Sequence, residues 1–99
     1  MPAKNPKVLE DLSQRVDEVL HYIWDPIGVS DIPEARDEYF SYVASVVSHL
    51  LANENASKVG SFLDRIVIEQ MGLPGNLDHS TRVAGILIEW KEFLCNQPA

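Results

Sequence analysis

Cysteine is nearly absent from this chain of 99 residues, because Cys95 is the only one. A lone cysteine cannot form a disulfide within the chain, which is typical of a protein in a reducing compartment. No apolar run approaches the roughly 18 to 20 residues that a membrane-spanning helix needs. The opening stretch MPAKNPKVLEDL also lacks the apolar core of a secretory signal. We therefore expect one cytoplasmic domain over residues 1–99 that does not enter a membrane.

A basic cluster is also lacking. Nine acids minus two arginines between Glu10 and Glu38 give −7, which is the whole formal net charge of the chain. Nucleic acids and anionic membrane surfaces bind basic surfaces, so we expect neither as a partner. A basic protein would be attracted to this segment. The alternative interpretation of the same acids is a well-solvated helix face.

Signatures of catalysis and of metal binding are missing too. The sequence has no Cys-x-x-Cys, His-Glu-x-x-His, calcium-loop, nucleophile-elbow or phosphate-loop pattern. His21 and Asp25 have the spacing of two ligands on one helix face, but Pro26 disfavours helix at Asp25. Glu34 and Glu38 would share a helix face as a carboxylate pair, although acids are commonplace in a first helical turn. We expect no metal, no cofactor and no enzymatic activity.

What the sequence does contain is apolar residues at steps of three and four. This spacing predicts amphipathic helices over about residues 6–23, 32–52, 56–71 and 78–95. Trp90 falls within the apolar stripe of the last one, which predicts a core position. Four helices joined by short loops predict an all-α fold, a compact bundle of about four helices.

Helix ends are marked by caps and prolines. Asn5-Pro6 has a capping residue followed by a first-turn proline. Trp24-Asp25-Pro26 ends the first predicted helix, because a residue before proline is disfavoured in helical conformation. Asp31-Ile32-Pro33-Glu34 has the form of a capping box that starts the second helix. Gly72 is placed to end the third in a left-handed conformation.

The segment HYIWDPIGVSDIPEARDEYFSY, residues 21–42, joins the first two predicted helices and combines aromatic with acidic side chains. That combination is typical of protein-binding hot spots. For Trp24 the alternative is a lid on the core whose indole N–H bonds a backbone carbonyl. The predicted partner-binding residues are Tyr22, Trp24, Asp25, Asp31, Glu34, Asp37, Glu38 and Tyr39.

The same segment resembles a family of short bacterial proteins of unknown function with a W-D-P-I-G … P-x-x-x-D-E-Y-x-x-Y signature. The matching residues are Trp24-Asp25-Pro26-Ile27-Gly28, Pro33, Asp37-Glu38-Tyr39, Tyr42 and later Glu69-Gln70-Met71-Gly72-Leu73. The resemblance covers about residues 19–73 and implies a small helical fold without an established activity. Phe40 follows the D-E-Y triplet where members often carry aspartate, so an acidic position becomes apolar.

Our hypothesis is a non-enzymatic, acidic protein-binding domain, most specifically a bacterial immunity protein. It would neutralise a basic, nuclease-type toxin domain by direct binding, since a nuclease has to be basic to hold a phosphate backbone. The alternative is a self-associating structural or regulatory module, which would form a homodimer. Its contact residues would be the surplus apolar side chains Phe40, Ile68, Ile88 and Phe93. A third hypothesis is a small enzyme that uses the acidic corner, residues 25–38.

Overall fold

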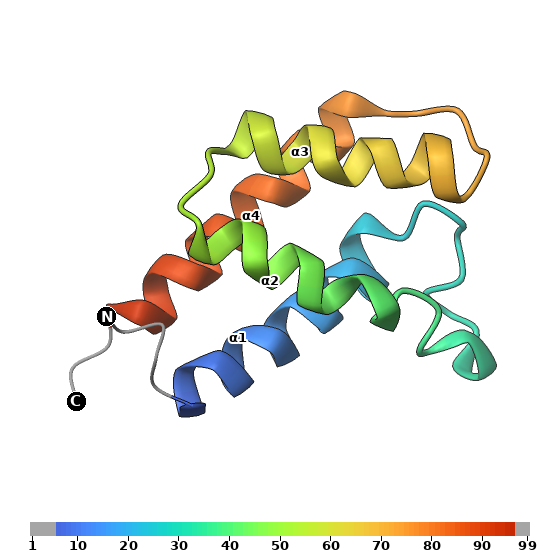
Figure 1. Ribbon diagram of the computed structural model, residues 1–99. Helices are drawn as coiled ribbons and strands as arrows, with labels where there is room; N and C mark the ends of the chain where they lie inside the picture. Colours follow the sequence, from blue (N-terminus) through green and yellow to red (C-terminus); the bar gives the residue numbers. More distant parts are fainter. Residues whose placement is uncertain (1–5, 97–99) are drawn as a thin grey trace.

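The computed structural model describes residues 6–96, which form an all-α bundle of four helices with no strand in that range. Helix α1 spans Pro6–Val19, α2 spans Val43–Leu51, α3 spans Ala56–Arg65 and α4 spans Leu77–Cys95. Helix α4 packs against α1 and α3, and α1 packs against α2 (Figure 1). The segment between α1 and α2 lies at the opposite end of the bundle from the end of α4 (Figure 1). Within the described range, no helix has the length and apolarity required to span a membrane.

The first predicted helix is confirmed to within one residue of its end. After α1 the helix continues through a π turn, Leu20–Trp24, and ends at Asp25, whose backbone is left-handed with φ 35°. The Asp25 N–H donates to the carbonyl of Leu20 at 3.0 Å, which closes this wide turn. Pro26 follows directly and cannot donate to a continuing helix. The predicted cap at Asn5 lies outside the described residues.

The predicted helix over 32–52 is wrong in its first half. Between residues 33 and 42 the chain forms two short 3-10 turns, Pro33–Ala35 and Phe40–Tyr42, and α2 begins only at Val43. Ile32, not Asp31, precedes the first turn, and no side chain caps it. The expected capping box is therefore absent.

The physical reason is the placement of Tyr39. Its side chain is only 1% exposed, and its hydroxyl reaches back to the turn that follows α1. The backbone at Tyr39, with φ −103° and ψ 6°, lies outside the α-helical region. Since no continuous helix links Glu34 to Glu38, these two acids do not form the predicted pair on one helix face.

The third and fourth predicted helices agree with the structure to within one residue at each end. Helix α3 continues through a second π turn, Ile66–Gln70, and Gly72 follows with a left-handed φ of 67°, as predicted. Asn55 and Asn76 cap α3 and α4, because each side-chain oxygen accepts from a backbone N–H three residues later, at 2.9 and 3.1 Å.

Aliphatic side chains from all four helices form the core. Those exposed by 1% or less are Leu12, Val16, Leu20, Val46, Leu50, Val59, Leu63, Val83, Ala84 and Leu87. Trp90 was predicted to be a core residue, but it is only half-buried, with the guanidinium of Arg15 5.6 Å from its ring centre. The core therefore lies between α4 and the other helices, and Trp90 is at its edge.

Helices α3 and α4 lie close together at Gly60. A Cβ at this position would lie 2.7 Å from Thr81 Oγ1 and 2.8 Å from Thr81 Cα, and the latter atom belongs to the backbone of α4. Gly85, further along α4, provides the contrast, because a Cβ there would have no atom within 4 Å. Of these two glycines, only Gly60 is required by helix packing.

We expect Gly60→Ala to lower the free energy of unfolding by about 1–3 kcal/mol, because the added methyl group has to push the two helices apart. Gly85→Ala is the matched control and should leave it unchanged or raise it by up to about 1 kcal/mol, through better helix propensity. Urea unfolding followed by circular dichroism measures both. Equal stability of the two variants would show that α3 and α4 separate without strain.

Candidate protein-binding surface

Asp25 organises the connection between α1 and α2, which we call the joint (residues 25–42). Its Oδ1 accepts from the backbone N–H groups of Gly28 at 3.1 Å and Val29 at 2.8 Å, and its Oδ2 accepts from Ser30 N–H at 3.1 Å. The Tyr39 hydroxyl donates to Oδ1 at 2.7 Å. The carboxylate is thus fully used inside the fold. Asp25, one of the predicted partner-binding residues, therefore holds the joint together from within.

Tyr39 and Trp24 lie in the core beneath the joint. The Tyr39 hydroxyl also accepts from the Ile27 N–H at 3.0 Å, and its ring lies edge-on to Trp24, with centroids 5.4 Å apart. Tyr42 contacts Trp24 in the same manner at 6.2 Å. Because Trp24 and Tyr39 are only 2% and 1% exposed, the prediction that they anchor a partner is wrong. The burial of Trp24 agrees with the alternative prediction that this residue is a lid on the core. The hydrogen bond predicted from its indole N–H to a backbone carbonyl is not found among residues 6–96.

The pKa values of Asp25 and Tyr39 shift in opposite directions. Burial on its own would raise the pKa of Asp25, but the hydrogen bonds from Val29, Tyr39 and Ser30 outweigh it and hold the pKa below its ordinary 3.8. Burial, followed by the hydrogen bond to Asp25, raises the pKa of Tyr39 above its ordinary 10.0. The charged carboxylate and the neutral phenol therefore stabilise each other across the whole neutral range.

His79 ties the end of the first helix to α4. Its Nε2 lies 3.0 Å from the carbonyl oxygen of Ile23 and 3.1 Å from that of Trp24, so this nitrogen carries the proton and donates to both. Such a bond satisfies carbonyl groups that the end of a helix leaves open. The sequence showed His79 only as an isolated histidine, since its partners lie more than 50 residues away.

Four acids of the joint remain directed outward. Asp31, Glu34, Asp37 and Glu38 are exposed, and no hydrogen bond or ion pair of their side chains is found among residues 6–96. By contrast, three acids of α1 are neutralised locally. The pairs are Asp11 with Lys7, Asp17 with Arg36, and Glu18 with Arg15. The excess charge predicted for residues 10–38 is therefore concentrated on the joint.

Apolar side chains stand exposed beside these acids. Tyr22, one of the predicted partner-binding residues, is 58% exposed, and Phe40 is 62% exposed. Ile27 and Ile32 are each 43% exposed. Phe40 was not among the predicted partner-binding residues. The sequence did mark Phe40 in another way, as one of the surplus apolar side chains suggested for a homodimer.

The ion pair between Arg36 and Asp17 involves two neighbouring hollows of this surface, because Arg36 lines one of them and Asp17 lines the other. Arg36 Nη2 donates to Asp17 Oδ2 at 3.1 Å, and its guanidinium carbon lies 5.3 Å from the centre of the Tyr22 ring. The Tyr22 hollow, of about 320 Å³, is lined by His21, Tyr22, Ser30, Asp31, Ile32, Pro33 and Arg36. The Phe40 hollow, of about 550 Å³, is lined by Ser13, Gln14, Asp17, Phe40, Ser41, Val43 and Ala44. The sequence did not indicate Arg36, because its partner lies 19 residues earlier.

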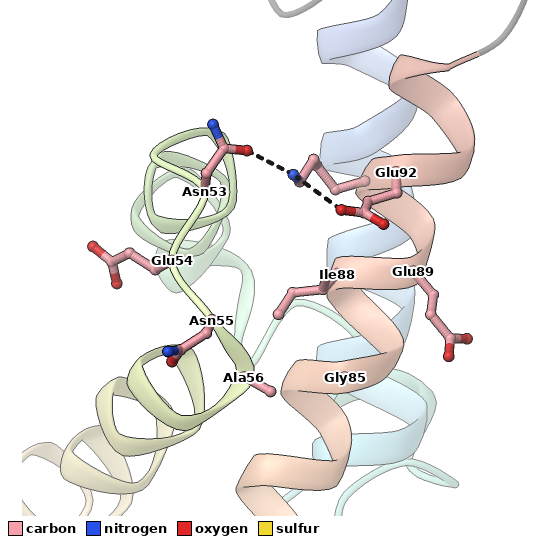
Figure 2. A pocket seen from close by; sticks show the side chains of 9 residues that line it. Asn53, Glu54, Asn55, Ala56, Gly85, Ile88, Glu89 and Glu92 are labelled. Atoms are coloured by element: carbon pink, nitrogen blue, oxygen red, sulfur yellow. Dashed lines mark hydrogen bonds and ion pairs between the residues drawn. The ribbon is translucent and has the colours of Figure 1, made fainter.

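A third hollow, of about 440 Å³, lies between the loop after α2 and helix α4 (Figure 2). The buried Lys91 donates from Nζ to Asn53 Oδ1 at 2.8 Å and lies 3.9 Å from Glu92 Oε2. The carboxylates of Glu54 and Glu89 point away from the space between loop and helix (Figure 2). This lysine therefore ties the loop to α4, and the polar groups of the hollow do not converge on a common point.

Comparisons add no relative to this description: no family model, no curated protein and no solved structure matches the chain. Within residues 6–96, no three His, Cys, Asp or Glu side chains are grouped so that they could hold a metal ion. The candidate site is therefore defined by geometry and charge, as a surface of two hollows, exposed aromatic rings and unpaired acids.

The interlocked pair Asp25 and Tyr39 can be tested by a double-mutant cycle. We expect Asp25→Asn and Tyr39→Phe each to lower the free energy of unfolding by about 1–3 kcal/mol, because each leaves a buried hydrogen-bonding group without its partner. The double variant should lose less than the sum of the two, since both remove the same bond. Tyr22→Phe, at an exposed ring, is the control without a stability change. Strict additivity in urea unfolding would contradict the coupling.

The lowered pKa of Asp25 also predicts a pH dependence. The stabilisation from the charged carboxylate is complete above the ordinary pKa of 3.8 and is lost as pH falls through the lower pKa of the folded chain. The stability difference between the natural chain and Asp25→Asn should therefore be constant near neutral pH and shrink in acid. Urea unfolding between about pH 7 and about pH 2 measures it. A difference that stays constant down to the acid end would refute this assignment.

Proposed function

We propose that this chain is a non-enzymatic protein-binding domain for a basic partner, and more specifically an immunity protein that neutralises a basic, nuclease-type toxin domain. The observation that carries the proposal is the joint itself. Four exposed, unpaired acids lie there beside exposed aromatic and aliphatic side chains. The fold neutralises or internalises several neighbouring acids but leaves these four available.

Electrostatics supports a basic partner. Unpaired like charges on one short segment repel each other, and a complementary surface relieves that repulsion while it steers the encounter. A domain that holds a phosphate backbone has to carry such a basic surface. An acidic protein that covers this surface competes with nucleic acid for the same lysine and arginine side chains.

The structure changes which residues serve as anchors in this proposal. Tyr22 remains a proposed anchor and Phe40 takes the place of Trp24 and Tyr39, because exposed aromatic rings next to hollows are the usual centres of interface energy. The contacting acids are Asp31, Glu34, Asp37 and Glu38. Asp25 supports the interface indirectly, by shaping the turn that carries Ser30 and the residues after it.

Self-association is the second candidate, and one observation favours it. Phe93 is 58% exposed at an apolar hollow of about 370 Å³ formed with Ile86, Glu89 and Trp90. The residues suggested for a homodimer do not share one hollow, however, because Ile88 lines the hollow of Figure 2 and Phe40 lines another near α1. Catalysis at the acidic corner has less support, because Asp25 is engaged in internal hydrogen bonds.

The test begins with capture of the partner from the source cell and its identification by mass spectrometry. We expect Asp37→Lys with Glu38→Lys to slow association with that partner about tenfold at low ionic strength and to weaken the salt dependence. Glu69→Lys with Glu89→Lys is the matched control, since it changes the net charge equally at exposed positions of η5 (Ile66–Gln70) and α4. The association rate of this control variant should differ from that of the natural chain by less than about twofold.

Two results would contradict the proposal. One is a partner that carries no basic surface and no toxic activity. The other is an equal loss of association rate in both double variants, which would mean that only the overall charge matters. For a nuclease-type partner, addition of the natural chain should also abolish cleavage of DNA or RNA, and the joint variant should require a higher concentration to do so.

A further inference from the structure

The Tyr22 hollow is lined in part by His21, a buried histidine whose Nδ1 has no hydrogen-bond partner in the described chain. His21 lies on the π turn after α1, lines the hollow and is only 2% exposed. Its Nδ1 is enclosed, with no hydrogen-bond partner within residues 6–96. A buried polar atom without a partner is destabilising and uncommon in folded proteins. An unsatisfied ring nitrogen on a residue that lines a hollow is a group that a ligand can satisfy once the ring is uncovered.

The other walls of the hollow favour a cationic side chain with an apolar stem. Asp31 carries a charge without a partner among the described residues, while Arg36 is already neutralised by Asp17 at 3.1 Å. Asp17, which neutralises Arg36, lines the neighbouring hollow, so Asp31 is the one charge of this lining that is left without a partner in the described range. Ile32 and Pro33 supply apolar surface of the kind along which lysine stems pack.

We propose that the Tyr22 hollow binds a lysine side chain of the basic partner, an inference that rests on the proposed function. The ammonium donates to the Asp31 carboxylate, to the Ser30 hydroxyl oxygen and to the His21 imidazole in the tautomer whose Nδ1 is unprotonated. An arginine fits less well, because Arg36 already lies over the Tyr22 ring at 5.3 Å.

Tyr22 is the part of the hollow that yields on binding. Its ring packs edge-on against the His21 imidazole, with centroids 4.4 Å apart and an interplanar angle of 88°. Since Tyr22 is 58% exposed, its ring can turn aside with little loss of buried contact. This movement uncovers the imidazole, and it makes Tyr22 both the cover of the hollow and a contact to the partner.

The experiment uses the full chain, labelled with ¹⁵N and ¹³C, and a small probe. Nα-acetyl-lysine N-methylamide is titrated while backbone amides and histidine ring signals are recorded by NMR. We expect saturable shifts confined to the lining of the hollow, that is the His21 ring, Tyr22 and residues 30–33. Nα-acetyl-norleucine N-methylamide, which lacks the charge, and Nα-acetyl-glutamate N-methylamide, which reverses it, should produce no saturable shifts there.

A matched pair of variants separates the hollow from general electrostatics. Asp31→Asn should weaken lysine binding about three- to fivefold, the upper range for one exposed ion pair, whereas Asp37→Asn should change it by less than about twofold. Both positions are exposed, so both variants should retain the fold. Equal effects would overturn the lysine site and leave the acidic docking surface as proposed.

Other outcomes are equally decisive. Saturable binding of the glutamate probe would show that the hollow binds an anion at Arg36. The absence of any saturable shift would show that the hollow binds neither the lysine probe nor the glutamate probe. Either of these two results overturns the inference. If the lysine probe binds as expected but the captured partner ignores charge reversal at Asp37 and Glu38, the proposed function fails while the lysine site stands.

Discussion

The hydrogen bond from the Tyr39 hydroxyl to the Asp25 carboxylate is the contact on which the shape of the joint depends. It connects two turns 14 residues apart, and the same carboxylate holds the backbone of the intervening loop. Because Asp25 accepts several hydrogen bonds, its negative charge is retained despite partial burial. Trp24 then packs against the Tyr39 ring, so the polar contact and the aromatic contact support each other.

This interaction separates the acids of the segment into two groups. Asp25 is turned inward, where its charge serves the fold, and Asp31, Glu34, Asp37 and Glu38 are left on the outside without partners in the described chain. The short 3-10 turns that bring Tyr39 inward also display Phe40, its neighbour, to solvent. One structural requirement therefore produces both the closed core and the exposed combination of charge and apolar surface.

The signature residues of the resembling family acquire a structural explanation in this chain. Trp24, Asp25 and Ile27 each contact Tyr39, and Gly28 supplies a φ of 80° that other residues rarely adopt. Such a motif specifies how two helices are joined. Within it Trp24, Asp25 and Tyr39 serve the fold, whereas Asp37 and Glu38 of the same signature are exposed to solvent.

Apolar periodicity determined three of the four predicted helices to within about a residue, since repeated steps of three and four leave few other ways to bury Leu12, Val59 or Leu87. The exposed acids and Tyr22 were also predictable, because charge and composition are properties of the sequence itself. Only the tertiary structure decided that residues 33–42 are turns, that Trp24 and Tyr39 are buried, and that Arg36 pairs with Asp17. The position of Tyr39 depends on Asp25, 14 residues away, and that of Arg36 on Asp17, 19 residues away. His79 likewise binds carbonyl groups more than 50 residues away. The spacing of neighbouring residues in the sequence does not reveal contacts between residues this far apart.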